Sequence, residues 1–429
     1  EIVKDKRIFK SVGFVSYKIK NGNKVEPIDA LNIQNGKKLF VCDICGFVTL
    51  KDKLKNDKCP ICQNSIQAVS GEVAAPLGYC TDFYNYEYKI YDGRLKWKDH
   101  TTSTNLDIEN SKIHFNNLKN SNICFGNNAD PKLGTIQTFN TNNGELFHVK
   151  ETINNEWIDI NSVKNQNYPF KNNIVKQVSL VSTFVTGVLK LGIFNVNSNL
   201  CLNSIGGSSK KDIIHSALIS WGNLVRKSLA IHLDIEMNEL SVGYCFSNEN
   251  NKIIPTIYII ENLENGSGYT NYLGNNPEVI RKCVIDDLTE NSIIYNNLAN
   301  PDHEESCDTS CYDCLSDFQN QQEHSFLNWR LGLDMVQISN NVNYCPSIEK
   351  QEYWKNLIER SCITFKNIKP EKNDFLYQNH NWIVSNNHDK KVIVHPLWSD
   401  EKIDKLCYSL GLNKNDYIFI TEFVKALEI

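Results

Sequence analysis

The sequence of 429 residues predicts a mixed α/β protein of the α+β class from three features. Residues 71–175 contain runs of alternating apolar and polar side chains between turn signals, as in Tyr84–Ile90, which is typical of antiparallel strands. Lys211–Leu233 has apolar residues three and four positions apart, which indicates an amphipathic helix. Val178–Phe194 and Lys252–Ile260 are apolar runs on either side of that helix, and each has the composition of buried strands.

The rest of the chain continues this mixture. The spacing of apolar residues predicts further helices over Phe318–Gln337, Tyr353–Cys362 and Asp400–Leu410. Further strands are predicted over Glu239–Phe246, Asn381–Ser385, Lys391–Val394 and Tyr417–Ile420. We therefore expect four regions: a first cysteine module (1–70), a β-rich region (71–175), a central mixed α/β domain (176–340) and a small α/β appendage (341–429).

Charge and hydropathy limit the class of protein. The net charge of −5 gives no overall basic field for nucleic acid, and no segment approaches the ~20 apolar residues of a membrane helix. Seven of the fifteen cysteines stand in closely spaced clusters, which in a reducing compartment indicates metal binding. We expect a cytoplasmic protein without a membrane partner. Because the chain begins with Glu1 and has no targeting signal, we also expect it to be the C-terminal part of a longer protein.

The first cysteine cluster has the spacing of a zinc ribbon. Two C-x-x-C pairs, thirteen residues apart, supply four thiolates: Cys42, Cys45, Cys59 and Cys62. Each pair offers two sulfur atoms from one tight turn, and four sulfur atoms complete a tetrahedron around Zn²⁺. Since no coordination position stays open, the sequence predicts a structural zinc ion and not a catalytic one.

A second cluster lies in the central domain. Cys307, Cys311 and Cys314 are three close sulfur donors, and His303 stands four residues before the first of them. His303 is the nearest fourth ligand, while Cys283 and His324 are alternatives that the sequence leaves open. Any of these would complete a closed site, so a second structural zinc is expected.

No motif for nucleotide hydrolysis is present. The turn Asn265–Tyr269 contains two glycines between a strand and a helix, and such a turn either binds phosphate or packs the helix against its sheet. The sequence has no Walker A lysine and no D-E-x-H box. We therefore expect no catalytic residues and no ATP hydrolysis by this chain alone.

The second cluster and the residues after it resemble a known family. Cys307–Cys314, Asn320, His324 and Leu327–Asp334 are similar to the C-terminal signature of the MrfA-type zinc-binding (MZB) domain of superfamily 2 DNA helicases. Thr186–Leu189, Ser216–Leu218, Leu233–Leu240 and Glu264–Tyr269 add weaker matches upstream, and Pro76–Tyr79 and His395–Trp398 resemble flanking segments of the same proteins. Gly187 and Asn328 depart from the pattern, since the family often has Asp at both places.

The resemblance implies an accessory role. In that family the zinc-binding domain follows two RecA-like lobes, in helicases of DNA repair or bacterial anti-phage defence. ATP and Mg²⁺ would then be used by a motor in a preceding part of the protein. This chain would brace that motor, shape the DNA path or bind a partner subunit of a defence system.

Two functions follow as hypotheses. In the first, the chain is a helicase-associated region that contacts DNA without sequence preference through basic side chains, for which the candidates are Lys210, Lys211, Arg226, Lys227 and Arg330. In the second, it is a zinc-stabilised protein-interaction scaffold of a defence complex without a motor of its own. The sequence does not identify the DNA substrate, the partner subunits, the pathway or the role of residues 341–429.

Overall fold

The computed structural model describes residues 2–3, 13–14, 17–20, 23–27, 31–34, 36–42, 44–50, 54, 58–68, 71–75, 79–80, 102–106, 115–127, 134–142, 145–153, 157–160, 169–203, 208–249, 252–368, 373–386 and 389–427. The chain forms two compact units: unit 1 comprises residues 1–111 and 134–185, and unit 2 comprises 112–133 and 186–429. This division differs from the four expected regions, because 112–133 join unit 2 and the appendage 341–429 belongs to that unit as well.

Unit 1 is built on a ten-stranded sheet in which β17 is the longest strand. Strand β9 runs parallel to β17 and antiparallel to β5, while β15 pairs antiparallel with β17 and β11 pairs antiparallel with β14. The strands are β1 (Ile2–Val3), β2 (Gly13–Phe14), β5 (Ile33–Gln34), β9 (Glu72–Ala74), β10 (Tyr79–Cys80), β11 (Thr102–Leu106), β14 (Gly134–Asn140), β15 (Phe147–Glu151), β16 (Trp157–Asp159) and β17 (Lys176–Thr186). The expected strand Tyr84–Ile90 and the segment Pro76–Gly78 lie outside the described residues.

A small three-stranded sheet in unit 1 carries the first cysteine cluster. It consists of β6 (Leu39–Val41), β7 (Val48–Leu50) and β8 (Gln67–Ala68), with β6 in the middle. Leu39, Val48 and Leu50 are buried together with Val73 and Phe139 of the ten-stranded sheet. The apolar side of the ribbon therefore packs on the larger sheet. A separate hairpin joins β3 (Tyr17–Lys20) to β4 (Asn23–Pro27).

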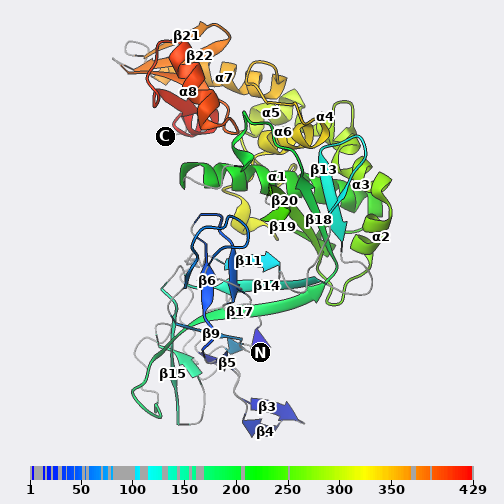
Figure 1. Ribbon diagram of the computed structural model, residues 1–429, viewed down its shortest axis with the longest axis vertical. Coiled ribbons are helices and arrows are strands. Elements are labelled where there is room, and N and C mark those ends of the chain that lie inside the picture. The colour runs from blue at the N-terminus through cyan, green and yellow to red at the C-terminus, as the bar shows by residue number, and fades with distance from the viewer. Residues whose placement is uncertain are drawn as a thin grey trace. The chain divides into compact units, whose positions relative to one another are not determined.

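Unit 2 is centred on an antiparallel five-stranded sheet covered by a long helix (Figure 1). The strand order is β12 (Asn116–Asn117), β13 (Ile123–Asn127), β18 (Val188–Ile193), β20 (Lys252–Glu261) and β19 (Leu240–Glu249). Helix α1 (Ser208–Leu233) packs on this sheet. The close approach of the helix to the sheet requires glycine at position 222, because a Cβ atom there would collide with the side chain of Val242 on β19. The predicted helix and the strands that flank it are thereby confirmed, and Val178–Phe194 forms two strands.

Shorter helices follow β20. They are α2 (Tyr269–Asn275), α3 (Pro277–Val284), α4 (Ile293–Leu298), α5 (Pro301–Ser306) and α6 (Trp329–Asn340). Helix α6 packs against α1 at Gly332. A Cβ atom added at this position would lie 3.3 Å from the carbonyl carbon of Ser220 on α1. The prediction of a helix from Phe318 is wrong at its start. The helix begins at Trp329 because the Asn328 side chain accepts hydrogen bonds from the backbone N–H groups of Arg330 and Leu331.

The appendage in unit 2 is a four-stranded sheet with three helices (Figure 1). Its elements are α7 (Glu352–Ile368), β21 (Asn373–Gln378), β22 (Asn381–Asn386), β23 (Asp389–Val394), α8 (Asp400–Ser409), β24 (Tyr417–Phe419) and α9 (Ile420–Lys425). The sheet order is β21-β22-β23-β24, and only the β23–β24 pair is parallel. Its apolar core is continuous with the core around α1 and α6. Among the described helices, none has the length and apolar character needed to cross a bilayer.

A buried polar network joins α6 to this appendage. The carboxylate of Asp334, with no solvent exposure, accepts hydrogen bonds from Tyr353 Oη, Trp354 Nε1 and His395 Nε2 at 2.8, 2.8 and 2.9 Å. Nδ1 of His395 accepts from the N–H of Leu397, which places the ring proton on Nε2. The Asp334 carboxylate is thus held by three donors, two from α7 and one from the segment after β23.

Candidate metal centres

The first cysteine cluster is formed by two turns with the same backbone pattern. In the first turn the N–H of Cys42 donates to Phe47 O and the N–H of Gly46 to Cys42 O. The second turn repeats both hydrogen bonds between Cys59 and Asn64 and between Gln63 and Cys59. Gly46 and Gln63 occupy equivalent positions and both have left-handed φ angles, 72° and 61°. The repeated turn aims two sulfur atoms per pair toward the same point.

The sulfur atoms have the separations that a tetrahedral ion requires. Cys42 Sγ lies 3.5 Å from Cys62 Sγ, and Cys45 Sγ lies 3.4 Å from Cys59 Sγ. A regular tetrahedron with Zn–S bonds of about 2.3 Å has S···S distances of about 3.8 Å. All four cysteines are free thiols, and their sulfur atoms lie within 4.8 Å of one another. The donor set therefore fits Zn²⁺, and it leaves no position open for a substrate.

The second cluster brings together His303, Cys307, Cys311 and Cys314, whose ligand atoms also lie within 4.8 Å of one another. Cys314 Sγ lies 3.8 Å from Cys307 Sγ and 3.6 Å from Cys311 Sγ. His303 Nε2 lies 3.5 Å from Cys311 Sγ, while His303 Nδ1 donates to Leu298 O at 2.8 Å. That second hydrogen bond fixes the ring and leaves the Nε2 lone pair directed at the sulfur atoms, as metal-binding histidines require.

The two alternative fourth ligands lie elsewhere. Cys283 is in the apolar core, where burial raises the pKa of its thiol to about 12. His324 Nε2 is bonded to Asp317 O and to Asn320 Oδ1. Of the three candidates, the structure places only His303 beside the sulfur atoms, and the site fits a Cys₃His zinc centre.

Both clusters contain a thiol with a low pKa. A hydrogen bond from the Cys45 thiol lowers the pKa of Cys59 to about 5, and one from Cys307 lowers the pKa of Cys314 to about 5. In each case the hydrogen bond outweighs burial, which acts in the opposite direction. The thiolate is the metal-binding form, so the lowered pKa favours that form for one ligand of each cluster.

The second metal loop, residues 303–324, is held by cationic side chains from three helices. From α1, Arg226 pairs with Asp317, and Lys227 Nζ donates to the carbonyls of Asp313 and Cys314 at 2.9 and 3.2 Å. From α6, Arg330 NH1 donates to Cys307 O and Asp308 O. From α7, Arg360 pairs with Asp308 and donates to Glu304 O. The loop is therefore clamped on several sides.

These contacts bear on the residues predicted to bind DNA. Arg330 is fully buried and Arg226 nearly so, and burial lowers the pKa of each guanidinium to about 10. Lys210 is also buried, and its amine donates to Trp398 O and pairs with Asp400. Lys227 is half-buried, and Lys211 alone of the five is exposed. Contact with DNA by these residues remains a prediction, for which Lys211 is the accessible candidate.

The backbone N–H groups of the glycine-containing turn at Asn265–Tyr269 bind a side-chain carboxylate of the same chain. The buried carboxylate of Glu261, at the end of β20, accepts hydrogen bonds from the backbone N–H groups of Ser267, Gly268 and Thr270 and from Thr270 Oγ1. Gly187 faces the same carboxylate, and a Cβ atom there would collide with it. The turn is therefore a packing device, and Gly187 leaves room for the carboxylate where the family pattern has a side chain.

Replacing Glu261 with Ala is expected to lower the free energy of unfolding by about 1–3 kcal/mol, because buried N–H donors lose their acceptor. Urea unfolding of the purified chain measures this change. Glu264→Ala is the matched control, since Glu264 is exposed in the same turn and its loss should cost less than about 0.5 kcal/mol. Equal effects of the two substitutions would contradict the role given to Glu261.

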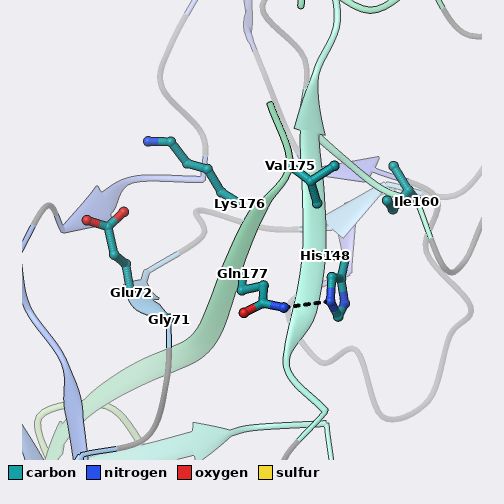
Figure 2. Close-up of a pocket in the computed structure, with 7 residues that line it drawn as sticks. All are labelled: Gly71, Glu72, His148, Ile160, Val175, Lys176 and Gln177. Atoms are coloured by element: carbon teal, nitrogen blue, oxygen red, sulfur yellow. Dashed lines mark hydrogen bonds between the residues drawn. The ribbon is translucent and has the colours of Figure 1, made fainter. Parts of the chain in front are cut away.

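Unit 1 contains a surface hollow between β9, β15 and β17 (Figure 2). Its lining residues are Gly71, Glu72, His148, Ile160, Val175, Lys176 and Gln177. His148 and Gln177 are cross-strand neighbours whose side chains lie 3.0 Å apart, and Glu72 accepts from the N–H of Gly36. The hollow contains none of the candidate site residues predicted from the sequence.

The sequence analysis did not predict that Arg360 and Asn356 contact Glu304 beside the second metal loop, or that Glu261 binds the glycine-containing turn. Arg360 and Asn356 contact Glu304, which is 56 and 52 residues away in the sequence, so no local sequence pattern predicts these contacts. Glu261 has a signal that sequence analysis can use: an acidic residue at the end of a buried strand, directly before a glycine-containing turn. Asp334 and His395 are both within the segments that carry the family resemblance, although their contact was not foreseen.

Comparisons with known proteins give little to this assignment. No family model matches the chain, and no curated protein matches it. Among solved structures it is similar to the crystal structure of the DUF1998 helicase MrfA bound to DNA, with 11% sequence identity and a TM-score of 0.32 over 56% of this chain and 25% of that one. The structure of MrfA bound to DNA and AMPPNP gives 11% identity and a TM-score of 0.24, over 56% of this chain and 22% of that one. The chain thus spans about a quarter of MrfA, and similarity at these values assigns neither fold nor function.

Proposed function

We propose that this chain is a zinc-binding accessory region of a superfamily 2 DNA helicase of DNA repair or anti-phage defence, located in the cytoplasm. Two structural zinc ions would stabilise its two units. ATP hydrolysis with Mg²⁺ would belong to motor domains elsewhere in the protein, because this sequence contains no motif for it. The contact with DNA would be independent of base sequence.

One observation carries this proposal. The residues that resemble the MZB signature act together: Cys307, Cys311 and Cys314 converge with His303, and the helix that follows binds the same loop. Trp329 Nε1 and Arg330 NH1 both donate to Cys307 O, and Asp334 on that helix anchors the appendage. The resemblance therefore coincides with one connected structural unit, in which the metal acts as a crosslink and takes no part in a reaction.

The scaffold hypothesis is the second candidate, and a specific observation favours it. Lys210, Arg226, Lys227 and Arg330 all have partners within the protein, so most of the expected phosphate contacts are already engaged. A zinc-stabilised scaffold without its own motor needs no such contacts.

Binding of labelled DNA at several salt concentrations separates the two candidates. If the chain contacts DNA, affinity should fall steeply with salt, and Lys211→Ala should reduce the slope of log K against log salt by about 1. Lys355→Ala, at an exposed position of α7, is the control and should leave the slope unchanged. Absence of binding even at low salt would exclude the DNA contact and leave the scaffold. A full-length protein without ATPase activity would exclude the helicase motor.

A further inference from the structure

Three large apolar side chains are exposed beside the second metal loop. Ile231, near the end of α1, is 66% exposed, and Tyr312 and Phe318 of the loop are 71% and 82% exposed. A hydrogen bond holds the two elements together: Lys227, one turn before Ile231, donates to the carbonyl of Asp313, next to Tyr312. On the other side of the loop, Gln319 Nε2 donates to Asn238 O, so Phe318 lies near the segment that follows α1.

The loop that presents the two aromatic rings is rigidly supported. Asp317, directly before Phe318, pairs with Arg226, and its side chain also accepts from the N–H groups of Gln319 and Asn320. The ring of Tyr312 meets the ring of His324 edge to face, with the centroids 5.7 Å apart. Exposed aromatic side chains on a fixed backbone lose little conformational entropy when a partner covers them. Such positions are typical of binding hot spots.

The charge around these side chains is acidic. No Lys or Arg occurs in residues 228–251 or in residues 304–329. The same two segments contain the exposed carboxylates of Asp234, Glu236 and Asp313. Arg226 and Lys227, which directly precede the first segment, are engaged with Asp317 and with backbone carbonyls. The exposed carboxylates of these two segments therefore have no Lys or Arg within the same segments, which opposes nucleic acid and favours a basic partner.

We propose that Ile231, Tyr312 and Phe318 form a docking surface for a basic amphipathic segment of a partner protein. Apolar side chains of that segment would cover the three residues, and its Lys or Arg side chains would face Asp234, Glu236 and Asp313. The surface is separate from Lys211, near the other end of α1. It therefore does not depend on whether the chain binds DNA.

A labelled synthetic helix of leucine and lysine serves as the probe, and a leucine–glutamate helix serves as its charge-reversed control. The lysine peptide is expected to bind the chain, and the double variant Tyr312→Ser/Phe318→Ser should weaken binding by at least about tenfold. Asp313→Lys should weaken it as well. The variant Ile363→Ser/Tyr408→Ser removes two side chains of comparable exposure, 64% and 86%, from the appendage and should bind like the wild type.

Zinc content and circular dichroism of each variant show that the fold is retained, since all the substituted side chains are exposed. The proposal is overturned if the lysine peptide does not bind, if the two double variants bind it equally, or if the glutamate peptide binds as well as the lysine peptide. Loss of single-stranded DNA binding in Tyr312→Ser/Phe318→Ser, with peptide binding unchanged, would identify the surface as a base-stacking site instead. The salt dependence at Lys211 is measured separately, so failure of this proposal and of the DNA contact can be told apart.

Discussion

Replacing Cys314 with Ser is expected to reduce the zinc content from two ions per chain to one and to unfold the second metal loop. Cys314 is the thiol with the lowered pKa, and its sulfur atom approaches two of the other ligands. Structural zinc contributes about 10–16 kcal/mol to folding in zinc-finger peptides, so loss of a ligand removes a large part of the local stability. Metal analysis and thermal unfolding measure both effects.

Two further cysteines make this experiment selective. Cys362→Ser changes a buried thiol of α7 that is outside both clusters, and the zinc content should stay at two. Cys45→Ser should also remove one zinc ion, but the loss of hydrogen-exchange protection should fall in unit 1, which contains that cluster. A Cys314→Ser protein that keeps two zinc ions would contradict the assignment of the second site.

Replacing Asp334 with Ala is expected to lower the free energy of unfolding by more than about 3 kcal/mol, because each of several buried donors left without an acceptor costs about 1–3 kcal/mol. The side chain is fully buried, and its removal leaves Tyr353 Oη, Trp354 Nε1 and His395 Nε2 without their acceptor. Because these donors come from α7 and from the segment after β23, protection from hydrogen exchange should be lost mainly between α6 and the appendage. Denaturant unfolding gives the size of the effect, and hydrogen exchange gives its location.

Asp404→Ala is the control for this prediction. Asp404 pairs with Lys414 on the surface at 2.9 Å, and an exposed pair of this kind contributes about 0–1 kcal/mol. If the two substitutions had equal effects, the buried network would not be what holds the appendage to the domain.

The elements of unit 2 were largely predictable because their apolar residues follow one period over long segments. Helix α1 and strands β19 and β20 appear where the spacing of apolar residues predicts them, within a few residues. The helix predicted from Phe318 begins at Trp329 instead, because the side chains of Asp317 and Asn320 bond to nearby backbone and favour turns. The spacing of apolar residues gives no information on hydrogen bonds between polar side chains and the backbone, which compete with helix formation.

The metal clusters were predictable from spacing alone, whereas the functions of nearby charges were not. Cysteine spacing is a local feature of the sequence, so the spacing within Cys42–Cys62 and within Cys307–Cys314 predicts each metal site directly. The fourth ligand depended on the course of α5, which directs His303 toward the sulfur atoms. Arg226 and Arg330 are of a residue type that commonly contacts DNA phosphates. Both are buried instead, through contacts with partners far away in the sequence.

The order of assembly follows from where the ligands and the clamps lie along the chain. All four ligands of the second site fall within residues 303–314, so an ion can close this loop at a small entropic cost before α7 arrives. Two of the side chains that hold it are far away in sequence: Arg226 precedes Asp317 by 91 residues, and Arg360 follows Asp308 by 52 residues. During synthesis the loop can therefore load its metal first, and α7 then closes over a loop whose shape is already fixed.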